Sequence, residues 1–141
     1  METLHIPAGK DTPEVYFGPD INMFQIEGIS YPANPIEFYE RVFEWLHAFF
    51  HSAKVENPID FNFKLDYFNT SSLKHFTKLL RIIGHSPACD YITVNWFYDE
   101  EDTDMLDAGK RLKQFAKTRF EFKKTEHSSD EDWNIDEMLN G

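Results

Sequence analysis

The stretch Ile59–Ile83, IDFNFKLDYFNTSSLKHFTKLLRII, combines a strand signal with a helix signal that follows almost at once. Residues 59–67 alternate between apolar and polar side chains, which is the period of a strand with one apolar face. The predicted apolar face consists of Ile59, Phe61, Phe63, Leu65 and Tyr67. From Leu73 onward the apolar residues recur at helical spacing, so the sequence predicts a strand that leads directly into a helix.

Four small polar residues, Asn69-Thr70-Ser71-Ser72, separate this strand from this helix. Such residues are common helix caps, and most clusters of this kind have no other role. The three hydroxyl groups nevertheless lie at a helix N-terminus, where unpaired backbone N–H groups and the helix dipole favour an added negative charge. Two interpretations therefore stay open, an ordinary cap and a site regulated by phosphorylation.

The rest of the chain carries similar signals in alternation. The other predicted strands are Leu4–Ile6 as a short edge strand, Glu14–Phe17, Asn22–Gly28, Tyr91–Phe97 and Arg119–Phe122. Two further helices are predicted, one from Pro35 to about His51 with Asn34 as its cap, and one after the acidic residues 99–104. A hairpin followed by alternating helices and strands predicts an α/β domain with parallel crossovers. We expect a single domain, residues 1–123, with a mixed β-sheet of about five strands and three helices, and an acidic C-terminal tail, residues 124–141.

Helical periodicity also predicts which side chains face the core. For the helix that begins at Pro35 they are Ile36, Tyr39, Val42, Phe43, Leu46, Phe49 and Phe50. For the last helix they are Met105, Ala108, Leu112, Phe115 and Ala116. Gly84 is expected to close the middle helix.

Composition excludes several classes of protein. A chain of 141 residues with 41% hydrophobic and 16% aromatic residues can bury a core, so it is not intrinsically disordered. The net charge of −11 argues against nucleic acid or an anionic membrane as a partner. The single cysteine, Cys89, rules out an intrachain disulfide framework and fits a reducing compartment, so we expect a cytoplasmic protein.

Two groups of residues are candidate metal ligands. His47 and His51 stand four residues apart on a predicted helix, but no third ligand is suggested. The acidic run Asp99–Asp104 offers carboxylates of the kind that bind Mg²⁺ or Ca²⁺, without the spacing of a known loop. We expect neither a metal nor another cofactor. The Asn69–Ser72 segment and this acidic run follow two successive parallel strands, so both should lie on one rim of the sheet. On this rim the acidic run could form a recognition surface.

Several short motifs complete a resemblance to a known family. The central one is Tyr67-Phe68-Asn69-Thr70-Ser71-Ser72. The others are Leu4-His5-Ile6, Thr12-Pro13, Ser30-Tyr31-Pro32 with Asn34, Glu44-Trp45-Leu46, and Asn95-Trp96-Phe97-Tyr98-Asp99. In this order and spacing they resemble the SiaC family of bacterial regulatory phosphoproteins. The resemblance covers about residues 4 to 122.

The resemblance implies a STAS-like fold, related to the anti-sigma-factor antagonists, and a partner-switching role in c-di-GMP signal transduction. A partner kinase would phosphorylate Thr70, and a metal-dependent PP2C-type phosphatase would remove the phosphate. The unphosphorylated form would bind and activate an effector such as a diguanylate cyclase. The predicted partner-binding residues are Tyr67, Asn69, Ser71, Ser72, Tyr98, Asp99, Glu100 and Asp102.

On this interpretation the protein is not an enzyme. The competing hypothesis is a metal-dependent phosphoryl-transfer enzyme that uses the Asp99–Asp104 loop together with the Thr70 hydroxyl. A weaker alternative is a small-molecule-binding domain. An enzyme requires titratable groups that converge in a concave pocket, whereas a partner switch requires Thr70 to be exposed on the rim.

Overall fold

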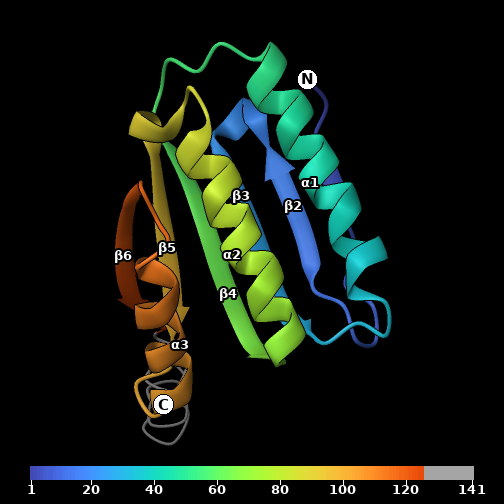
Figure 1. Ribbon diagram of the computed structural model, residues 1–141, viewed down its shortest axis with the longest axis vertical. Helices are drawn as coiled ribbons and strands as arrows, with labels where there is room; N and C mark the ends of the chain where they lie inside the picture. Colours follow the sequence, from blue (N-terminus) through green and yellow to red (C-terminus); the bar gives the residue numbers. More distant parts are fainter. Residues whose placement is uncertain (126–141) are drawn as a thin grey trace, which may run out of the picture.

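The six strands lie in the sheet in the same order as in the chain (Figure 1). The computed structural model describes residues 1–125. The strands are β1 (Leu4–Ile6), β2 (Glu14–Gly18), β3 (Met23–Ser30), β4 (Ile59–Phe68), β5 (Ile92–Tyr98) and β6 (Arg119–Lys124). The pairs β1–β2 and β2–β3 are antiparallel, and the pairs from β3 to β6 are parallel. The predicted mixed sheet is confirmed, with six strands instead of about five because β1 pairs with β2.

Each parallel crossover contains one of the three predicted helices. These are α1 (Pro35–Ser52), α2 (Thr70–His85) and α3 (Thr103–Lys113); two short 3-10 turns, Pro19–Ile21 and Cys89–Tyr91, lie in the connections. Right-handed crossovers that all step in one direction place their helices on one face of the sheet, and Figure 1 shows α1, α2 and α3 on the same face. No described helix covers the other face. None of the helices in residues 1–125 has the length and apolar character that a membrane span requires.

Aromatic side chains fill the layer between the sheet and the helices. Phe17, Phe24 and Phe61 pack together from three neighbouring strands and have almost no exposed surface. Trp96 is also fully buried, and its indole N–H donates to the Met105 carbonyl of α3 at 2.9 Å. Burying one such side chain contributes roughly 1.5–3 kcal/mol, so this layer is the main source of stability.

A β-bulge in β4 overturns one prediction about the apolar face. Leu65 pairs with Gly28 and Tyr67 pairs with Ile29, so Asp66 is an extra residue without a partner on β3. The extra residue reverses the alternation, because side chains on a strand change face at every step. Tyr67, predicted to be in the core, is 54% exposed, and Phe68 instead packs against Phe76 and Trp96.

Gly28 makes the bulge possible on the β3 side. Its φ angle is +110°, a conformation that residues with a Cβ atom rarely adopt. Glycine at this position therefore allows the register to shift between β3 and β4.

The ends of the helices also differ from the predictions. Ile36 is 70% exposed because it lies in the first turn of α1, ahead of Tyr39, the first buried side chain of that helix. Phe115 is 43% exposed because α3 ends at Lys113 and helical spacing stops there. Gly84 does not close α2, which continues to His85.

At the C-terminal end, Lys124, which the sequence analysis placed in the tail, is the last residue of β6 and pairs with Tyr98. Of the predicted tail, residues 126–141 lie outside the described residues.

Gly109 of α3 provides a test of how tightly this layer is packed. A Cβ atom at this position would lie 2.4 Å from Trp96 Cδ1 and 2.9 Å from Phe122 Cε1. Gly→Ala in a helix normally stabilises by about 1 kcal/mol, but this overpacking costs about 1–3 kcal/mol. We therefore expect Gly109→Ala to lower the free energy of unfolding, measured by urea denaturation.

Gly84→Ala in α2 is the control, because the added Cβ meets only the side chain of Lys117, at 3.1 Å. It should change the free energy of unfolding by less than about 1 kcal/mol. A stabilised Gly109→Ala protein would contradict the packing described here.

Candidate functional site

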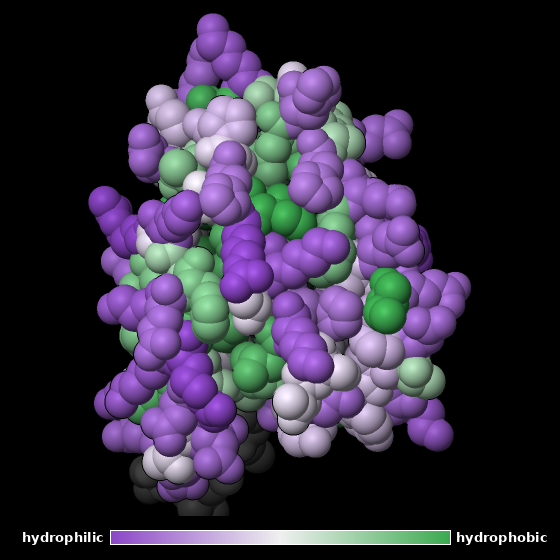
Figure 2. All heavy atoms as spheres, viewed as in Figure 1, coloured by the Kyte–Doolittle hydropathy of each residue, from purple (hydrophilic) through white to green (hydrophobic). Residues whose placement is uncertain are grey.

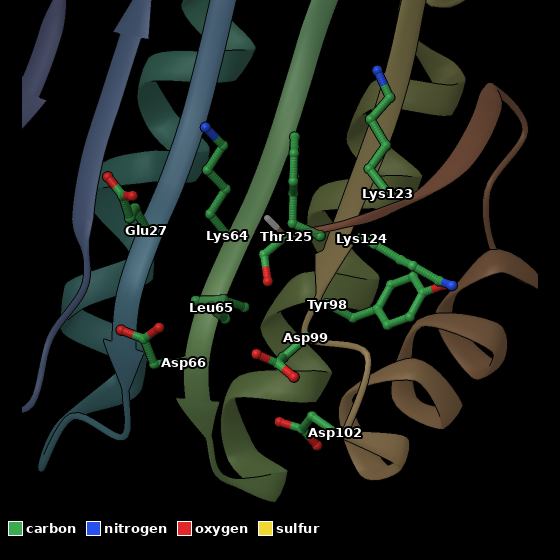
Figure 3. A pocket seen from close by; sticks show the side chains of 11 residues that line it. Glu27, Lys64, Leu65, Asp66, Tyr98, Asp99, Asp102, Lys123, Lys124 and Thr125 are labelled. Atoms are coloured by element: carbon green, nitrogen blue, oxygen red, sulfur yellow. The ribbon is translucent and has the colours of Figure 1, made fainter. Parts of the chain in front are cut away.

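The loops that follow β4 and β5 meet at one edge of the sheet, as the sequence analysis predicted. The two strands are adjacent and parallel, so their carboxyl ends lie side by side. Asn69 and Thr70 follow β4, and Asp99–Asp102 follow β5. Asp99 and Asp102 line one hollow together with Leu65 and Asp66 of β4 (Figure 3).

Asn69 organises the junction between β4 and α2. Its side-chain oxygen accepts hydrogen bonds from the Ser72 backbone N–H at 3.1 Å and from the Ser71 hydroxyl at 2.9 Å. Its backbone N–H donates to the Ser30 carbonyl at the end of β3, at 3.1 Å. Asn69 is therefore the N-cap, and Thr70 is the first helical residue.

The three hydroxyl groups of this junction have different environments. Ser72 has no exposed surface; its hydroxyl donates to the Ser30 carbonyl and lies 2.8 Å from the Ser30 hydroxyl. The Ser30 hydroxyl also bonds to the Tyr39 hydroxyl, and burial raises the pKa of Tyr39 to about 12. Ser71 is half-buried and donates to Asn69, whereas Thr70 is exposed. Thr70 is therefore the hydroxyl best placed to enter the active site of another protein.

Ser72 was predicted to contact a partner, but this position does not allow it. A residue with no exposed surface cannot touch another protein unless the junction opens. Its hydroxyl group instead holds the first turn of α2 against β3. Ser72 is thus a structural residue of the junction.

The first turn of α2 lacks the acidic residue that the other two helices carry. Glu37 lies in the first turn of α1 and Asp104 in the first turn of α3, but α2 has no acid there. Negative charge at a helix N-terminus is stabilising by about 0.3–1 kcal/mol. The first turn of α2 therefore contains no carboxylate of its own that would repel a phosphate on Thr70.

Ile29, Tyr31 and Tyr67 form an exposed apolar patch, which we refer to as the rim patch. The bond from the Asn69 N–H to the Ser30 carbonyl places Thr70 and Tyr31 each one residue from the same hydrogen bond, so the patch lies near Thr70. The bulge in β4 places Tyr67 opposite Ile29, and the rings of Tyr31 and Tyr67 form an edge-to-face pair with centroids 5.9 Å apart. The exposed fractions of the three side chains are 39%, 46% and 54%. The charge of Asp11, and a hydrogen bond to its carboxylate, raise the pKa of Tyr31.

The acidic loop after β5 uses its carboxylates mainly for local structure. The Asp99 side chain accepts from the Glu101 N–H at 2.9 Å, and Asp102 caps α3 by accepting from the Met105 N–H at 3.0 Å. Glu100 lies 3.6 Å from Lys124 in an exposed ion pair. Among residues 1–125, no three His, Cys, Asp or Glu side chains form a group that could hold a metal ion.

A shallow hollow of about 520 Å³ lies between this loop and the open face of the sheet (Figure 3). Asp99, Asp102 and the half-buried Tyr98 line it together with Lys64 and Lys123. Thr70 does not line it. The competing enzyme hypothesis needs the Thr70 hydroxyl and these carboxylates in one pocket, and this arrangement separates them.

Comparison with known proteins bears directly on this rim. Residues 6–125 match the model of a family described as SiaC family regulatory phosphoproteins. The chain belongs to the SiaC family. A regulatory phosphoprotein needs an accessible hydroxyl group, and the junction that carries Thr70 falls inside the matched residues.

Solved SiaC structures share this fold. The structure of apo-SiaC from Pseudomonas aeruginosa is 23% identical, with a TM-score of 0.76, and the match covers 87% of this chain and 99% of that one. SiaC in complex with the diguanylate cyclase SiaD, of which it is the activator, is 23% identical with a TM-score of 0.78, covering 86% of this chain and 99% of that one. An uncharacterised protein of P. aeruginosa strain UCBPP-PA14 is 26% identical over 119 residues, covering 81% of this chain and 90% of the relative.

Sequence reasoning missed Ile29 and Tyr31 as surface residues of the site. They form a patch with Tyr67 only because the bulge in β4 turns Tyr67 to the open face, opposite Ile29. Gly28 was the available signal, because a glycine near the end of a strand often marks a bulge. The buried pair of Ser30 and Tyr39 was also missed, since its members are separated along the chain and meet only in the folded protein.

The different environments of Ser72 and Thr70 predict different effects on stability. Ser72→Ala removes a buried hydroxyl bonded to Ser30 and should lower the free energy of unfolding by about 1 kcal/mol or more. Thr70→Ala should change it by less than about 0.5 kcal/mol, because Asn69 provides the cap. Urea denaturation of both variants beside the wild type measures this difference. Equal losses would show that the two hydroxyl groups do not have separate roles.

Proposed function

We propose that this protein is a non-enzymatic partner switch. A partner kinase phosphorylates Thr70, and a metal-dependent PP2C-type phosphatase removes the phosphate. The unphosphorylated protein binds and activates an effector, for which a diguanylate cyclase is the first candidate. We place this cycle in the cytoplasm, where ATP is available to the kinase and where the free thiol of Cys89 is compatible with a reducing environment.

The observation that carries this proposal is the exposure of Thr70 at the N-terminus of α2, next to Asn69, whose N–H bonds to Ser30 in the segment of the rim patch. The patch offers the aromatic and aliphatic surface that is typical of the centre of a protein interface. A hydroxyl at its border is a suitable position for a charge that interrupts such an interface. The description of the family as regulatory phosphoproteins supports the same conclusion.

Magnitudes indicate that phosphorylation would act on the interface more strongly than on the fold. A phosphate adds about −1.5 to −2 charges, and the N-terminus of α2 offsets part of this by about 0.3–1 kcal/mol. The free protein should therefore stay folded. An effector packed over the rim would have to bury this charge, which costs several kcal/mol without a matching cation. The carboxylates of the neighbouring loop make the surroundings less favourable still.

The choice of a diguanylate cyclase rests on similarity. SiaC of P. aeruginosa is the activator of the cyclase SiaD and forms a complex with it. The fold of that SiaC is shared by this chain, and the matched region includes the β4–α2 junction. We expect the rim patch, the exposed Thr70 and the half-buried Asn69 and Ser71 to contribute to the contact with the effector.

The proposal predicts how variants of Thr70 retain the effector. Thr70→Ala adds no charge and should retain it as the wild type does, whereas Thr70→Glu should retain clearly less. The measurement is an affinity pull-down from extract of the native cells, with diguanylate cyclase activity assayed in each bound fraction. In parallel, the wild type is incubated with the extract and ATP, and the phosphorylated residue is mapped by mass spectrometry.

Ser71→Glu is the matched control, because it adds the same charge one residue further along the helix on a half-buried side chain. It tests whether any nearby charge suffices or whether the position of Thr70 matters. Phosphate on Ser71 instead of Thr70, or equal retention by Thr70→Ala and Thr70→Glu, would contradict the proposed switch.

A further inference from the structure

We infer that the exposed face of α2 is a docking surface for the kinase, and that it binds an acidic surface of that enzyme through Lys74, Lys78, Arg81 and His85. This inference rests on the proposed function, because it assigns a second surface to the same switch. We refer to these four residues as the α2 stripe.

The α2 stripe is continuous and free of acids. Its members follow one another at intervals of four, three and four residues, which places them on one side of the helix, and all four are exposed. The helix contains no Asp or Glu at all, although the whole chain has 25 acidic residues against 14 Lys and Arg. Figure 2 shows the corresponding face of the molecule, where hydrophilic side chains lie over the helices. Among the described helices, α2 alone carries basic residues without any acidic residue.

The basic side chains of the stripe affect a neighbouring histidine and contact two aromatic rings. The pKa of His75 is lowered, first by burial and then by the positive charges of Lys78 and Lys74. Lys78 lies 4.5 Å from the ring centroid of Phe43, and the Arg81 guanidinium lies 5.5 Å from that of Phe115. Such contacts with rings restrict long side chains, so less conformational entropy is lost when a partner binds them.

The helix dipole explains only part of this pattern. Basic residues near a helix C-terminus are stabilising, and this accounts for His85, the basic residue in the last turn of α2. Lys74, in contrast, lies near the N-terminus of α2, where the dipole favours acids and where α1 and α3 carry them. The stripe therefore begins at a position that helix stability does not favour, one turn after Thr70.

At its far end the stripe opens into a groove between α1 and α2. The groove has a volume of about 630 Å³, and His47 and His51 of α1 line it together with Lys78, Arg81 and His85 of α2. Phe50 and Ile82 contribute its apolar part, and none of the residues that line it is acidic. Charge complementarity therefore favours an acidic segment as the occupant.

The chemistry of the two surfaces beside Thr70 distinguishes the kinase from the effector. The rim patch is apolar and aromatic, as expected for a complex that must persist. The α2 stripe is charged and exposed, and such surfaces raise association rates more than they raise affinity. A kinase must bind its substrate briefly and release the product. The phosphate that it adds to Thr70 weakens the attraction of an acidic partner for Lys74, and this promotes release.

The test compares rates of Thr70 phosphorylation at several concentrations of the full-length protein. The source of kinase is extract of the native cells, with ATP radiolabelled at the γ-phosphate. The double variant Lys78→Glu with Arg81→Glu should raise the apparent KM by about tenfold or more and leave the limiting rate within about twofold. Both residues are about 12–16 Å along α2 from Thr70, so neither reaches the transferred phosphate. The KM of the wild type should also rise steeply with salt.

Lys110→Glu with Arg111→Glu on α3 is the matched control, because it makes the same change of charge on another exposed helix face. It should leave the apparent KM within about twofold of the wild type. If thermal melting shows that the α2 variant is unfolded, the double variant Lys78→Gln with Arg81→Gln replaces it in the test. Its apparent KM should also rise, but by less.

The outcomes separate this inference from the proposed function. A wild-type protein that receives no phosphate on Thr70 overturns both. Normal phosphorylation of the wild type with an unchanged KM for the α2 variant overturns the inference alone. Loss of diguanylate cyclase activity from the pull-down with an unchanged KM would assign the stripe to the effector instead, and would also overturn it.

Discussion

The hydrogen bonds that tie Asn69 and Ser72 to Ser30 hold the start of α2 against the end of β3. Asn69 donates through its backbone and Ser72 through its hydroxyl, and both bonds end on the same carbonyl. The Ser72 hydroxyl is buried by this arrangement, while Thr70 is left on the surface. Neighbouring hydroxyl groups thus acquire different roles without any difference in their intrinsic chemistry. The proposal that Thr70 is the switch residue depends on this junction.

The bulge at Asp66 is the second determinant of the site. Without it, Tyr67 would face the helices and Phe68 would face solvent, because one residue of register reverses every side chain that follows. With it, Phe68 completes the core beneath α2, and Tyr67 joins Ile29 and Tyr31 on the surface. The same local irregularity therefore closes the core and creates the apolar surface beside Thr70.

Much of the fold could be predicted from periodicity and capping residues. The alternation in β4, the Asn34-Pro35 start of α1 and the dense apolar run of β5 are local patterns, and each forms the predicted element. The location of Thr70 at a strand-to-helix junction was predicted from the same local patterns, and the family motif singled it out from the neighbouring hydroxyl groups.

Other features could not be predicted because they depend on contacts between distant segments. The bulge requires the positive φ of Gly28 on a different strand, and the burial of Ser72 requires Ser30 and Tyr39. The exposure of Ile36 and Phe115 reflects their positions in the first turn of α1 and beyond the end of α3, which amphipathic spacing alone does not specify. The rim patch is accordingly a feature of the tertiary structure.

The central claim is that a charge on Thr70 changes an interface and leaves the fold intact. The most direct measurement is calorimetric titration of the effector with the protein fully phosphorylated on Thr70 and with the unphosphorylated protein, together with the melting temperature of each form. We predict that phosphorylation weakens binding by at least about tenfold, or ~1.4 kcal/mol, while the melting temperatures differ by only a few degrees. Equal affinities, or a phosphorylated form that is largely unfolded, would contradict the account.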